Sequence, residues 1–334
     1  MTEIAAPYLI YLGDTKMAEL AKTGAGLAYW RPERCLAQLT ESGCKADLGL
    51  PNMSVAEAAA KGAKTLVIGT AVPGGQLPPQ WVSRLVEAME LGMDIASGLH
   101  VPLASTPALA EAANRTGRML HDVRLAKKSF PIGSGRTRSG HRLLTMGTDC
   151  AIGKKYTALA IHRELLKRGV SADFRATGQT GVLIDGHGFA IDAVVSDFVA
   201  GAAETLSPAA APDHWDIIEG QGSLVHPAFA GVTLGLLHGS QPDAFVVCHE
   251  PGRNELSAFP GFPTAGINEL INLTVTLGRV TSPNIRCVGL SINTSRMGEA
   301  EAQAELDFLS RMHKLPASDP VRFGVSAIVD HMLR

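Results

Sequence analysis

The 334-residue sequence has few aromatic residues, few charged residues and no long hydrophobic run. Only 5% of the residues are aromatic and 19% are charged, and 30 Lys and Arg nearly balance 32 Asp and Glu. A net charge of -2 gives no broad basic surface, so no nucleic-acid partner is expected. No apolar stretch reaches the roughly 20 residues that span a bilayer, and the first residues do not form a signal peptide. We therefore expect a cytoplasmic protein without a membrane partner.

Cysteine is also scarce, with five scattered residues and no Cys-x-x-Cys pair. Disulfide frameworks and structural zinc sites need closer pairs, so neither a disulfide nor a metal site is expected. In contrast, 46% of the residues are apolar, which is enough to bury a core. Glycine is abundant at 35 residues, and it concentrates where a backbone turns sharply or approaches a ligand. The composition thus predicts a folded protein with ligand-binding loops.

Short apolar runs alternate with helical patterns along the chain, which is typical of α/β folds with mainly parallel sheets flanked by helices. Buried strands are predicted at 8–13, 65–70, 94–99, 118–123, 142–147, 216–220, 243–250 and 285–293. A basic, glycine-rich stretch at 126–141 interrupts this alternation and is interpreted as a linker. The pattern predicts two α/β domains, at 1–125 and 142–334.

The sharpest motif is GTDCAIGKK at 147–155, between a predicted strand and a predicted helix. Such a turn directs several backbone N–H groups and the positive end of the helix dipole at one point, where a phosphate can bind. Lys154 is placed to reach the same phosphate. An ordinary strand-to-helix turn is the structural alternative. The predicted cofactor-binding residues are Gly147, Thr148, Asp149, Cys150, Gly153, Lys154 and Lys155.

The position after the loop lysine changes the expected chemistry. A Ser or Thr hydroxyl usually binds Mg²⁺ there, whereas this sequence has Lys155, with Thr157 two residues further on. A second lysine cannot ligate a metal and would repel one. Two lysines suit a metal-free polyphosphate, such as the diphosphate or the 3′-phosphate of coenzyme A. Cys150 lies near a helix N-terminus and two lysines, which should lower the pKa of its thiol. Its role is then either that of a nucleophile or that of a small residue that fits the loop.

Further polar loops follow other predicted strands. The loop ATGQTG at 176–181 carries Gln179 and Thr180 at a strand's carboxyl end, where ligands bind in open α/β sheets. An ordinary polar turn is the alternative. Arg253 lies on the loop after the predicted strand 243–250, and its guanidinium could grip a carboxylate. Gln179, Thr180 and Arg253 are predicted to bind substrate.

The densest polar cluster is DIIEGQGSLVHP at 216–227. Its strand delivers Glu219 where P-loop proteins keep a carboxylate that faces the phosphates. Gln221 and Ser223 add directional polar groups and are predicted to bind substrate, and His226 follows them. The glycines between these residues leave backbone N–H groups available to an oxyanion. A packing role is the alternative for each side chain.

Four segments together resemble the D-glutamate N-acetyltransferase family: TMGTDCAIGKKYTAL, TGQTG, DFVAGAAE and EGQGSLVHPAFAGVTLGLLHG. The resemblance covers essentially the whole chain, and its phosphate loop is similar to that of dethiobiotin synthetase-type P-loop proteins. It implies a Rossmann-like domain at 1–125 and a P-loop-like catalytic domain at 142–334.

The resemblance also implies an activity, namely acetyl transfer from acetyl-CoA to the amine of D-glutamate in D-amino acid catabolism. Acetyl-CoA would be a cosubstrate held by residues 147–155, with no permanently bound cofactor. Glu219 is then the first candidate for the general base and His226 the second. Arg253 is the candidate for a substrate carboxylate. A homo-oligomer is expected.

Two alternatives stay open. A kinase or ligase of the dethiobiotin synthetase type would consume Mg-ATP and act on a small carboxylate, and Lys155 argues against it. A regulatory protein would bind a nucleotide or CoA without turnover, and the cluster of Glu219, Gln221 and His226 favours catalysis over it.

Overall fold

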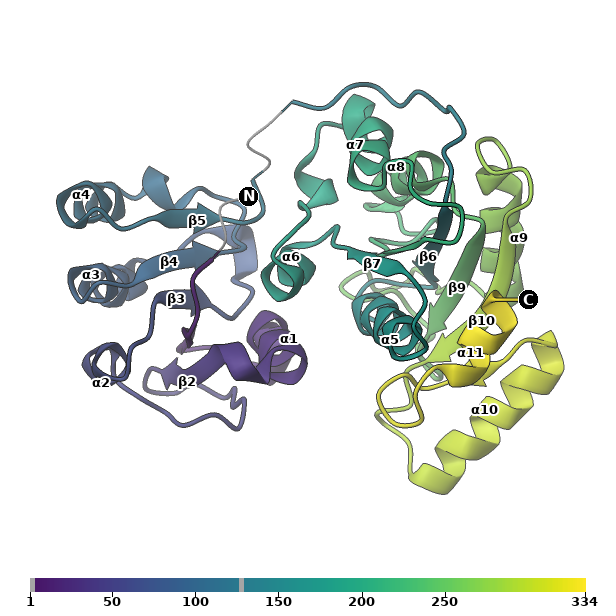
Figure 1. Cartoon of the computed structure of the whole chain (residues 1–334). Helices are drawn as coiled ribbons and strands as arrows, with labels where there is room; N and C mark the ends of the chain where they lie inside the picture. The colour runs from purple at the N-terminus through teal and green to yellow at the C-terminus, as the bar shows by residue number, and fades with distance from the viewer. Residues whose placement is uncertain (1–3, 126–128) are drawn as a thin grey trace. The chain divides into compact units, whose positions relative to one another are not determined.

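The computed structural model describes residues 4–125 and 129–334 (Figure 1). The chain divides into two compact units, and each is described by itself. The first unit holds the described residues before 126 together with Gly178–Ala193, and the second holds 129–177 and 194–334. Sequence analysis places all of 142–334 in one domain, whereas the structure groups 178–193 with the first unit. The start of the predicted linker, 126–128, lies outside the described residues.

The first unit is built on a five-stranded sheet whose strands are all parallel, in the order β2-β1-β3-β4-β5. Its strands are β1 (Tyr8–Gly13), β2 (Cys35–Thr40), β3 (Thr65–Ile68), β4 (Asp94–Ser97) and β5 (Leu120–Asp122). All residues of β1 and β3 are buried, because helices cover both faces of the sheet. These continuous apolar runs are the pattern expected of central parallel strands.

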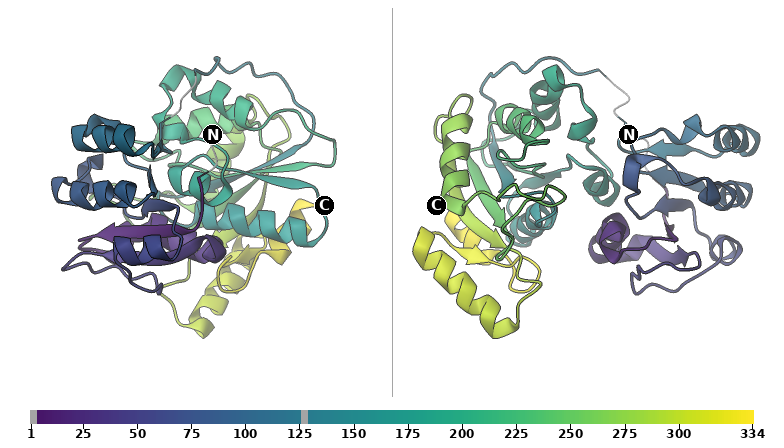
Figure 2. Two further views of the ribbon diagram at one scale, coloured as in Figure 1. Left: turned by 60° about the vertical axis from the view of Figure 1, so that its left-hand side comes forward. Right: turned by 180° about the vertical axis from the view of Figure 1, so that it is seen from behind.

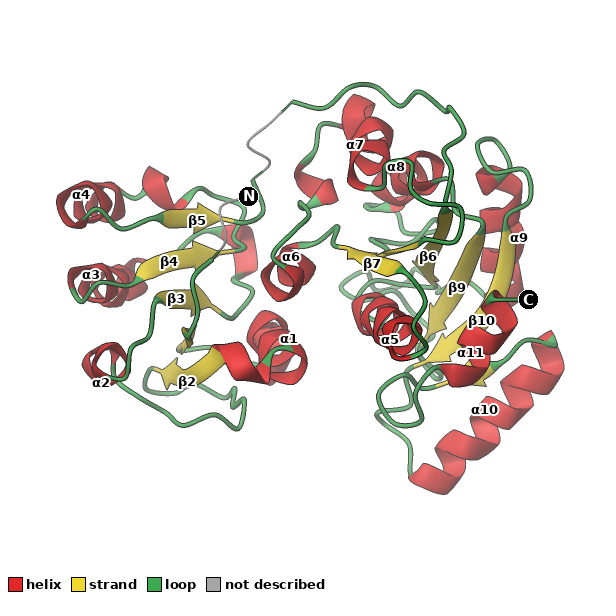
Figure 3. Cartoon of the chain, in the orientation of Figure 1, coloured by secondary structure: helices red, strands yellow, loops and turns green. Residues whose placement is uncertain are grey.

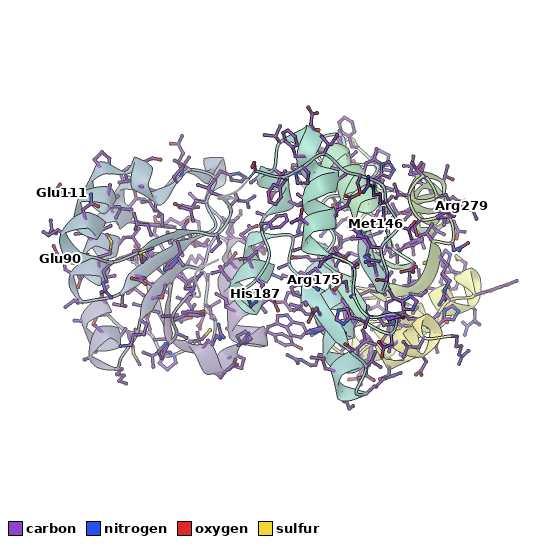
Figure 4. All side chains as sticks on the ribbon, turned by 45° about the horizontal axis from the view of Figure 1, so that its top comes forward. Glu90, Glu111, Met146, Arg175, His187 and Arg279 are labelled. Atoms are coloured by element: carbon purple, nitrogen blue, oxygen red, sulfur yellow. The ribbon has the colours of Figure 1, made fainter. Side chains whose placement is uncertain are left out.

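Five helices flank this sheet: α1 (Lys22–Trp30), α2 (Val55–Ala60), α3 (Val82–Glu90), α4 (Pro107–Thr116) and α6 (Gln179–Asp185). Helices α2, α3 and α4 cover one face, where Leu85 and Leu109 pack into the core, and α1 and α6 lie on the other (Figure 1). Helix α2 begins at a capping box between Ser54 and Glu57, which satisfies two backbone N–H groups. The outward faces of α3 and α4 carry Glu90 and Glu111 (Figure 4).

The second unit is built on a six-stranded parallel sheet in the order β11-β10-β9-β6-β8-β7. Its strands are β6 (His141–Gly147), β7 (Ala172–Arg175), β8 (Trp215–Ile218), β9 (Ala244–His249), β10 (Arg286–Ile292) and β11 (Ala317–Ser318). The central strand β6 lies between β8 and β9, so the loops that follow these three strands emerge at one edge. That edge carries the phosphate-loop motif.

The helices of the second unit are α5 (Lys154–Lys167), α7 (Val199–Leu206), α8 (Ala230–Ser240), α9 (Ile267–Gly278), α10 (Glu299–His313) and α11 (Ser326–Met332). Helices α5 and α11 pack on one face of the sheet, and α7, α8 and α9 pack on the other (Figures 2 and 3). With both sheets wholly parallel and flanked by helices, the predicted α/β class is confirmed.

The described part of the predicted linker is anchored to the second unit. The backbone N–H groups of Ser134 and Gly135 donate to the Glu204 carboxylate, and Arg138 Nη2 donates to the Gly239 carbonyl at 2.7 Å. The Arg138 side chain, one of the basic residues of the linker, thus caps the C-terminal end of α8. In the parts of the chain that the structure describes, no helix has the length and apolar character needed to cross a membrane.

Candidate active site

The loop at 147–155 joins β6 to α5 in a conformation that suits glycine. Gly153, the N-cap of α5, has φ of 113°, in the left-handed region that favours glycine. A Cβ at Gly147 would lie 2.8 Å from Lys154 Nζ, so glycine leaves room for the lysine to fold back over the end of the strand. The N-terminus of α5 therefore opens onto the loop, where the positive end of the helix dipole favours an anion.

Lys154 lies inside this loop. Its side chain is buried, and Nζ donates to the Asp149 carbonyl oxygen at 2.6 Å. Burial lowers the pKa of Lys154, and the acidic groups of Cys150, Cys248, Asp149 and Glu219 oppose that shift. The ammonium group is thus held away from water, where it interacts strongly with any anion that enters the loop.

The residues after Lys154 provide no hydroxyl for a metal ion. Lys155 is half-buried, with Nζ 5.4 Å from the centroid of the Tyr156 ring. The Thr157 hydroxyl is buried and occupied, because it donates to the Gly153 carbonyl at 3.0 Å and lies 2.7 Å from Ser291 Oγ. Neither side chain therefore offers an oxygen to Mg²⁺ beside the loop.

Asp149 ties the loop to the segment after β9. One carboxylate oxygen accepts from Arg253 Nη1 and from the Ser257 backbone N–H, both at 2.9 Å, and the other accepts from the Cys150 N–H at 2.6 Å. Arg253 also donates to the Cys150 carbonyl at 3.1 Å and pairs with Glu250. These three hydrogen bonds come from Nη1 and Nη2, and Nε of Arg253 makes no hydrogen bond to any residue that the structure describes.

Thr148 fixes the same loop to the neighbouring strand. Its N–H donates to the carbonyl of Cys248, the fifth residue of β9, at 3.1 Å, and its Oγ1 lies 3.0 Å from His249 Nδ1. Burial lowers the pKa of His249, and the Glu250 carboxylate opposes that shift. A polar group of the loop therefore meets one from the end of β9.

Glu219 follows β8 and is buried next to Thr177. Its Oε2 accepts from the Thr177 N–H at 3.2 Å, and Gln221 Nε2 donates to Thr177 Oγ1 at 3.1 Å. The structure thus brings the start of the predicted loop 176–181 together with the predicted cluster that follows β8. Gly220 is required here by space, since a Cβ would lie 1.6 Å from the Thr145 carbonyl oxygen.

His226 is buried between two aromatic rings. Its ring stacks on Phe229 at 4.5 Å between centroids and meets the edge-on ring of Phe259 at 4.6 Å. Burial lowers its pKa, Asp149 acts to raise it and Lys154 to lower it, so the neutral form is favoured. Because Nδ1 accepts from the Ala228 N–H at 3.2 Å, the proton of the neutral ring lies on Nε2. His226 is therefore held as a hydrogen-bond donor.

In addition to Arg253, four residues are predicted to bind substrate, and they are divided between the two units. Gln221 and Ser223 lie in the second unit near the phosphate loop, and the Ser223 hydroxyl is 3.5 Å from the Val225 nitrogen. Gln179 and Thr180 are the first two residues of α6 and belong to the first unit. Sequence analysis interprets this segment as a loop, whereas the structure has a helix from Gln179 onward.

Among the residues that the structure describes, two groups of side chains have the composition of metal ligands, with their ligand atoms within 4.8 Å of one another: Asp149, Cys150 and His226, and Asp173, His214 and Asp216. In the first group the Asp149 oxygens are already used by three N–H donors, including Arg253. In the second, Arg175 Nε donates to Asp216 at 2.7 Å. Guanidinium groups next to both sets disfavour a divalent cation at either one.

Sequence reasoning missed Thr145 and Ser257. Thr145 Oγ1 accepts from the Gly220 N–H at 2.9 Å, so it holds the loop after β8 against β6. A threonine inside the apolar run RLLTMG is a signal that could have identified it, because a polar group in a buried strand needs a partner. Ser257 acts through its backbone N–H, so its side chain carries no signal.

The fold and the loop define the class: an α/β protein with a Rossmann-like first half and a P-loop in its second half. The family models described as "Domain of unknown function (DUF1611_N) Rossmann-like domain" and "Domain of unknown function (DUF1611_C) P-loop domain" match residues 39–126 and 131–329, respectively. The chain belongs to this DUF1611 family.

Similar proteins cover nearly the whole chain. One, from Tritonibacter scottomollicae, is 47% identical over 98% of both chains, and another, from a Pseudoalteromonas species, is 44% identical over 99% of both. Both are named D-glutamate N-acetyltransferase. The crystal structure of a DUF1611 family protein from Anabaena variabilis has 33% identity and a TM-score of 0.90, over 98% of this chain and 99% of that one. The shared architecture therefore extends over both units.

Proposed function

We propose that this chain transfers the acetyl group of acetyl-CoA to the amine of D-glutamate, and that loop 147–155 binds the phosphates of the cosubstrate. Two whole-length relatives at 44–47% identity are named for acetyl transfer to D-glutamate, which supports the reaction and the acceptor. The anion-binding geometry of the loop supports a phosphorylated donor. Acetyl-CoA carries both the acyl group and the phosphates.

The observation that carries the proposal is the occupied hydroxyl of Thr157. Phosphoryl transfer in P-loop enzymes uses a Ser or Thr oxygen on Mg²⁺. Here Lys155 stands at that position, and the hydroxyl of Thr157 is bonded to Gly153 and Ser291. A loop with this donor set suits phosphates that are bound without a metal and stay intact through the reaction.

Acetyl transfer to an amine forms a C–N bond and breaks the C–S bond of the thioester. The amine must first lose a proton, and the departing thiolate takes one up, so the reaction needs a base and a proton return. We propose Glu219 as the base, because its carboxylate is buried, is held by the Thr177 N–H and lies beside the loop. Gln221 and Ser223 are proposed to bind the substrate there.

His226 is the second candidate for the base, and its geometry suits another role. To accept a proton at Nδ1 it would have to release the Ala228 N–H. As it stands, Nε2–H is buried and makes no hydrogen bond to any residue that the structure describes. We propose that Nε2–H of His226 donates a hydrogen bond to an oxygen of the bound cosubstrate.

The proposal is tested by release of free thiol from acetyl-CoA with the purified full-length chain and EDTA. D-Glutamate, L-glutamate and Mg-ATP are added separately. Thiol release that depends on D-glutamate and is unaffected by EDTA or ATP is the expected result. No thiol release with any amino acid, together with ADP formation from Mg-ATP and a small carboxylate, would overturn it in favour of a kinase or ligase.

A further inference from the structure

The first unit contains a cavity of about 60 Å³ that the proposed function does not use. It lies past the carboxyl ends of β3 and β4, beside the point where the chain order of the sheet reverses between β1 and β3. In open α/β sheets this is where ligands bind. Its polar lining comes from five separate segments: Thr23, Thr70, His100, Arg124 and Gln179.

Arg124 is the lining group with a permanent charge. Its side chain is buried, with Nε donating to the Gly98 carbonyl at 3.0 Å and Nη1 paired with Asp192. Asp192 is outside the cavity lining, so it holds the guanidinium from another side. Nη2 makes no hydrogen bond within 4–125 or 129–334. A buried guanidinium with unused N–H groups at a cavity favours an acidic ligand, and carboxylate is the group whose geometry it matches.

The other polar groups define the wall of the cavity. Thr23 and Thr70 are buried, and their hydroxyls are positioned by Thr180 at 2.9 Å and by Thr15 at 3.0 Å. Gln179 closes the cavity against Gly98, where a Cβ would lie 2.6 Å from Gln179 Cγ. Glycine at 98 thus makes room for a side chain that sequence analysis assigns to substrate binding.

The size of the cavity limits what it binds. On this measure one water needs roughly 10–15 Å³, so 60 Å³ holds only a few waters. A dinucleotide or coenzyme A is far too large. A carboxylate with the methylene groups next to it fits.

We propose that this cavity binds a carboxylate of the amino-acid substrate, with Arg124 as its partner. The identity of the amino acid rests on the proposed function, whereas the acidic ligand follows from the cavity itself. The site assigns to the first unit a direct part in substrate recognition.

Calorimetric titration of the full-length chain with D-glutamate, with and without CoA, tests the proposal. The variants are Arg124→Gln, which removes the guanidinium, and Gln179→Leu, which keeps the bulk at Gly98. The control is Arg115→Gln, an exposed arginine paired with Glu90 outside the cavity. We expect Kd and KM for D-glutamate to rise about tenfold or more in Arg124→Gln and severalfold in Gln179→Leu, with the control unchanged.

Each outcome bears on the cavity. If both variants bind D-glutamate within twofold of the wild type, the proposal is wrong. If Arg124→Gln does not fold, as judged by circular dichroism, Gln179→Leu and the conservative Arg124→Lys decide by the same criterion. If the wild type acetylates no amino acid, the proposed function fails separately, and the titration is repeated with L-glutamate and succinate. No binding of any of these carboxylates would also overturn the cavity proposal.

Discussion

The two sheets carry polar groups at their carboxyl edges, and they do so by different means. In the second unit the proposed site is one continuous backbone loop, 147–155, at the N-terminus of α5, with Lys154 buried inside it. In the first unit the proposed site is made by side chains from five segments around a small cavity. Backbone groups recognise the charge of a phosphate, whereas an assembled side-chain cavity can select a shape. The difference suits a cosubstrate anchored by its phosphates and a small substrate chosen by its carboxylate.

The two sites also differ in how their arginine side chains are paired with acidic groups. Beside loop 147–155, Arg253 pairs with both Asp149 and Glu250, so its positive charge has two acidic partners within the second unit. In the first unit Arg124 shares one acidic partner and keeps donors for the cavity. The four predictions below alter residues of the second unit, whereas the variants proposed above alter the cavity of the first.

The largest effect is expected from Gly220→Ala. The new Cβ would meet the Thr145 carbonyl oxygen at 1.6 Å, so the loop after β8 would have to move. We expect a loss of about 3 kcal/mol or more in the free energy of unfolding, and loss of acetyl transfer. The control is Gly231→Ala in α8, where a Cβ meets no atom within 4 Å and a gain of roughly 0.5–1 kcal/mol is expected. Equal urea midpoints for the two variants would contradict the geometry.

Replacing Glu219 with Gln should have the next largest effect. The amide keeps an oxygen for the Thr177 N–H, so the fold should persist while the base is lost. We expect kcat for D-glutamate acetylation to fall about 100-fold or more, with little change in KM for acetyl-CoA. Turnover near the wild-type rate would remove Glu219 from this role and leave His226 as the candidate.

Lys154→Ala distinguishes phosphate binding from a general structural role. With acetyl-CoA we expect KM to rise about tenfold or more, because a charged hydrogen-bond donor to phosphate is lost. S-Acetylpantetheine is a donor that lacks the phosphates of acetyl-CoA. With this donor, the variant and the wild type should have the same KM. The same loss with both donors would show that Lys154 acts by holding the loop through the Asp149 carbonyl.

The smallest effect is a pH dependence of stability. Burial lowers the pKa of His226 in the folded state, while Asp149 opposes and Lys154 adds to that shift. Below about pH 6.5 the unfolded chain then binds more protons than the folded chain, so acidification lowers the free energy of unfolding. His226→Gln should weaken this fall between about pH 6.5 and 5, because the titrating ring is removed. Urea titrations at several pH values measure it, and identical pH slopes would contradict a buried neutral ring.

The sequence predicts what lies close together along the chain. The strand, the glycine-rich turn and the helix around 147–155 are contiguous, so the order of these elements can be predicted from one segment. The apolar runs that form β1, β9 and β10 have the right length and burial for central parallel strands. Wholly parallel sheets in both units confirm that interpretation.

The features that could not be predicted from the sequence are assembled from segments that lie far apart in the chain. The cavity of the first unit joins Arg124 to Gln179 across 54 intervening residues, and no local pattern links them. Strand β2 was not predicted, because CLAQLT mixes polar with apolar residues and is not a continuous apolar run. The three partners of the Asp149 carboxylate include two backbone N–H groups, which have no side-chain signal. These features depend on tertiary contacts.

The central claim is that the two sites divide the substrates between them. The most direct test is steady-state kinetics of the wild type, Lys154→Ala and Arg124→Gln with both substrates varied. The account predicts that Lys154→Ala raises KM for acetyl-CoA alone, and that Arg124→Gln raises KM for D-glutamate alone. If Lys154→Ala raises KM for D-glutamate and leaves acetyl-CoA unaffected, or Arg124→Gln does the reverse, the division is contradicted.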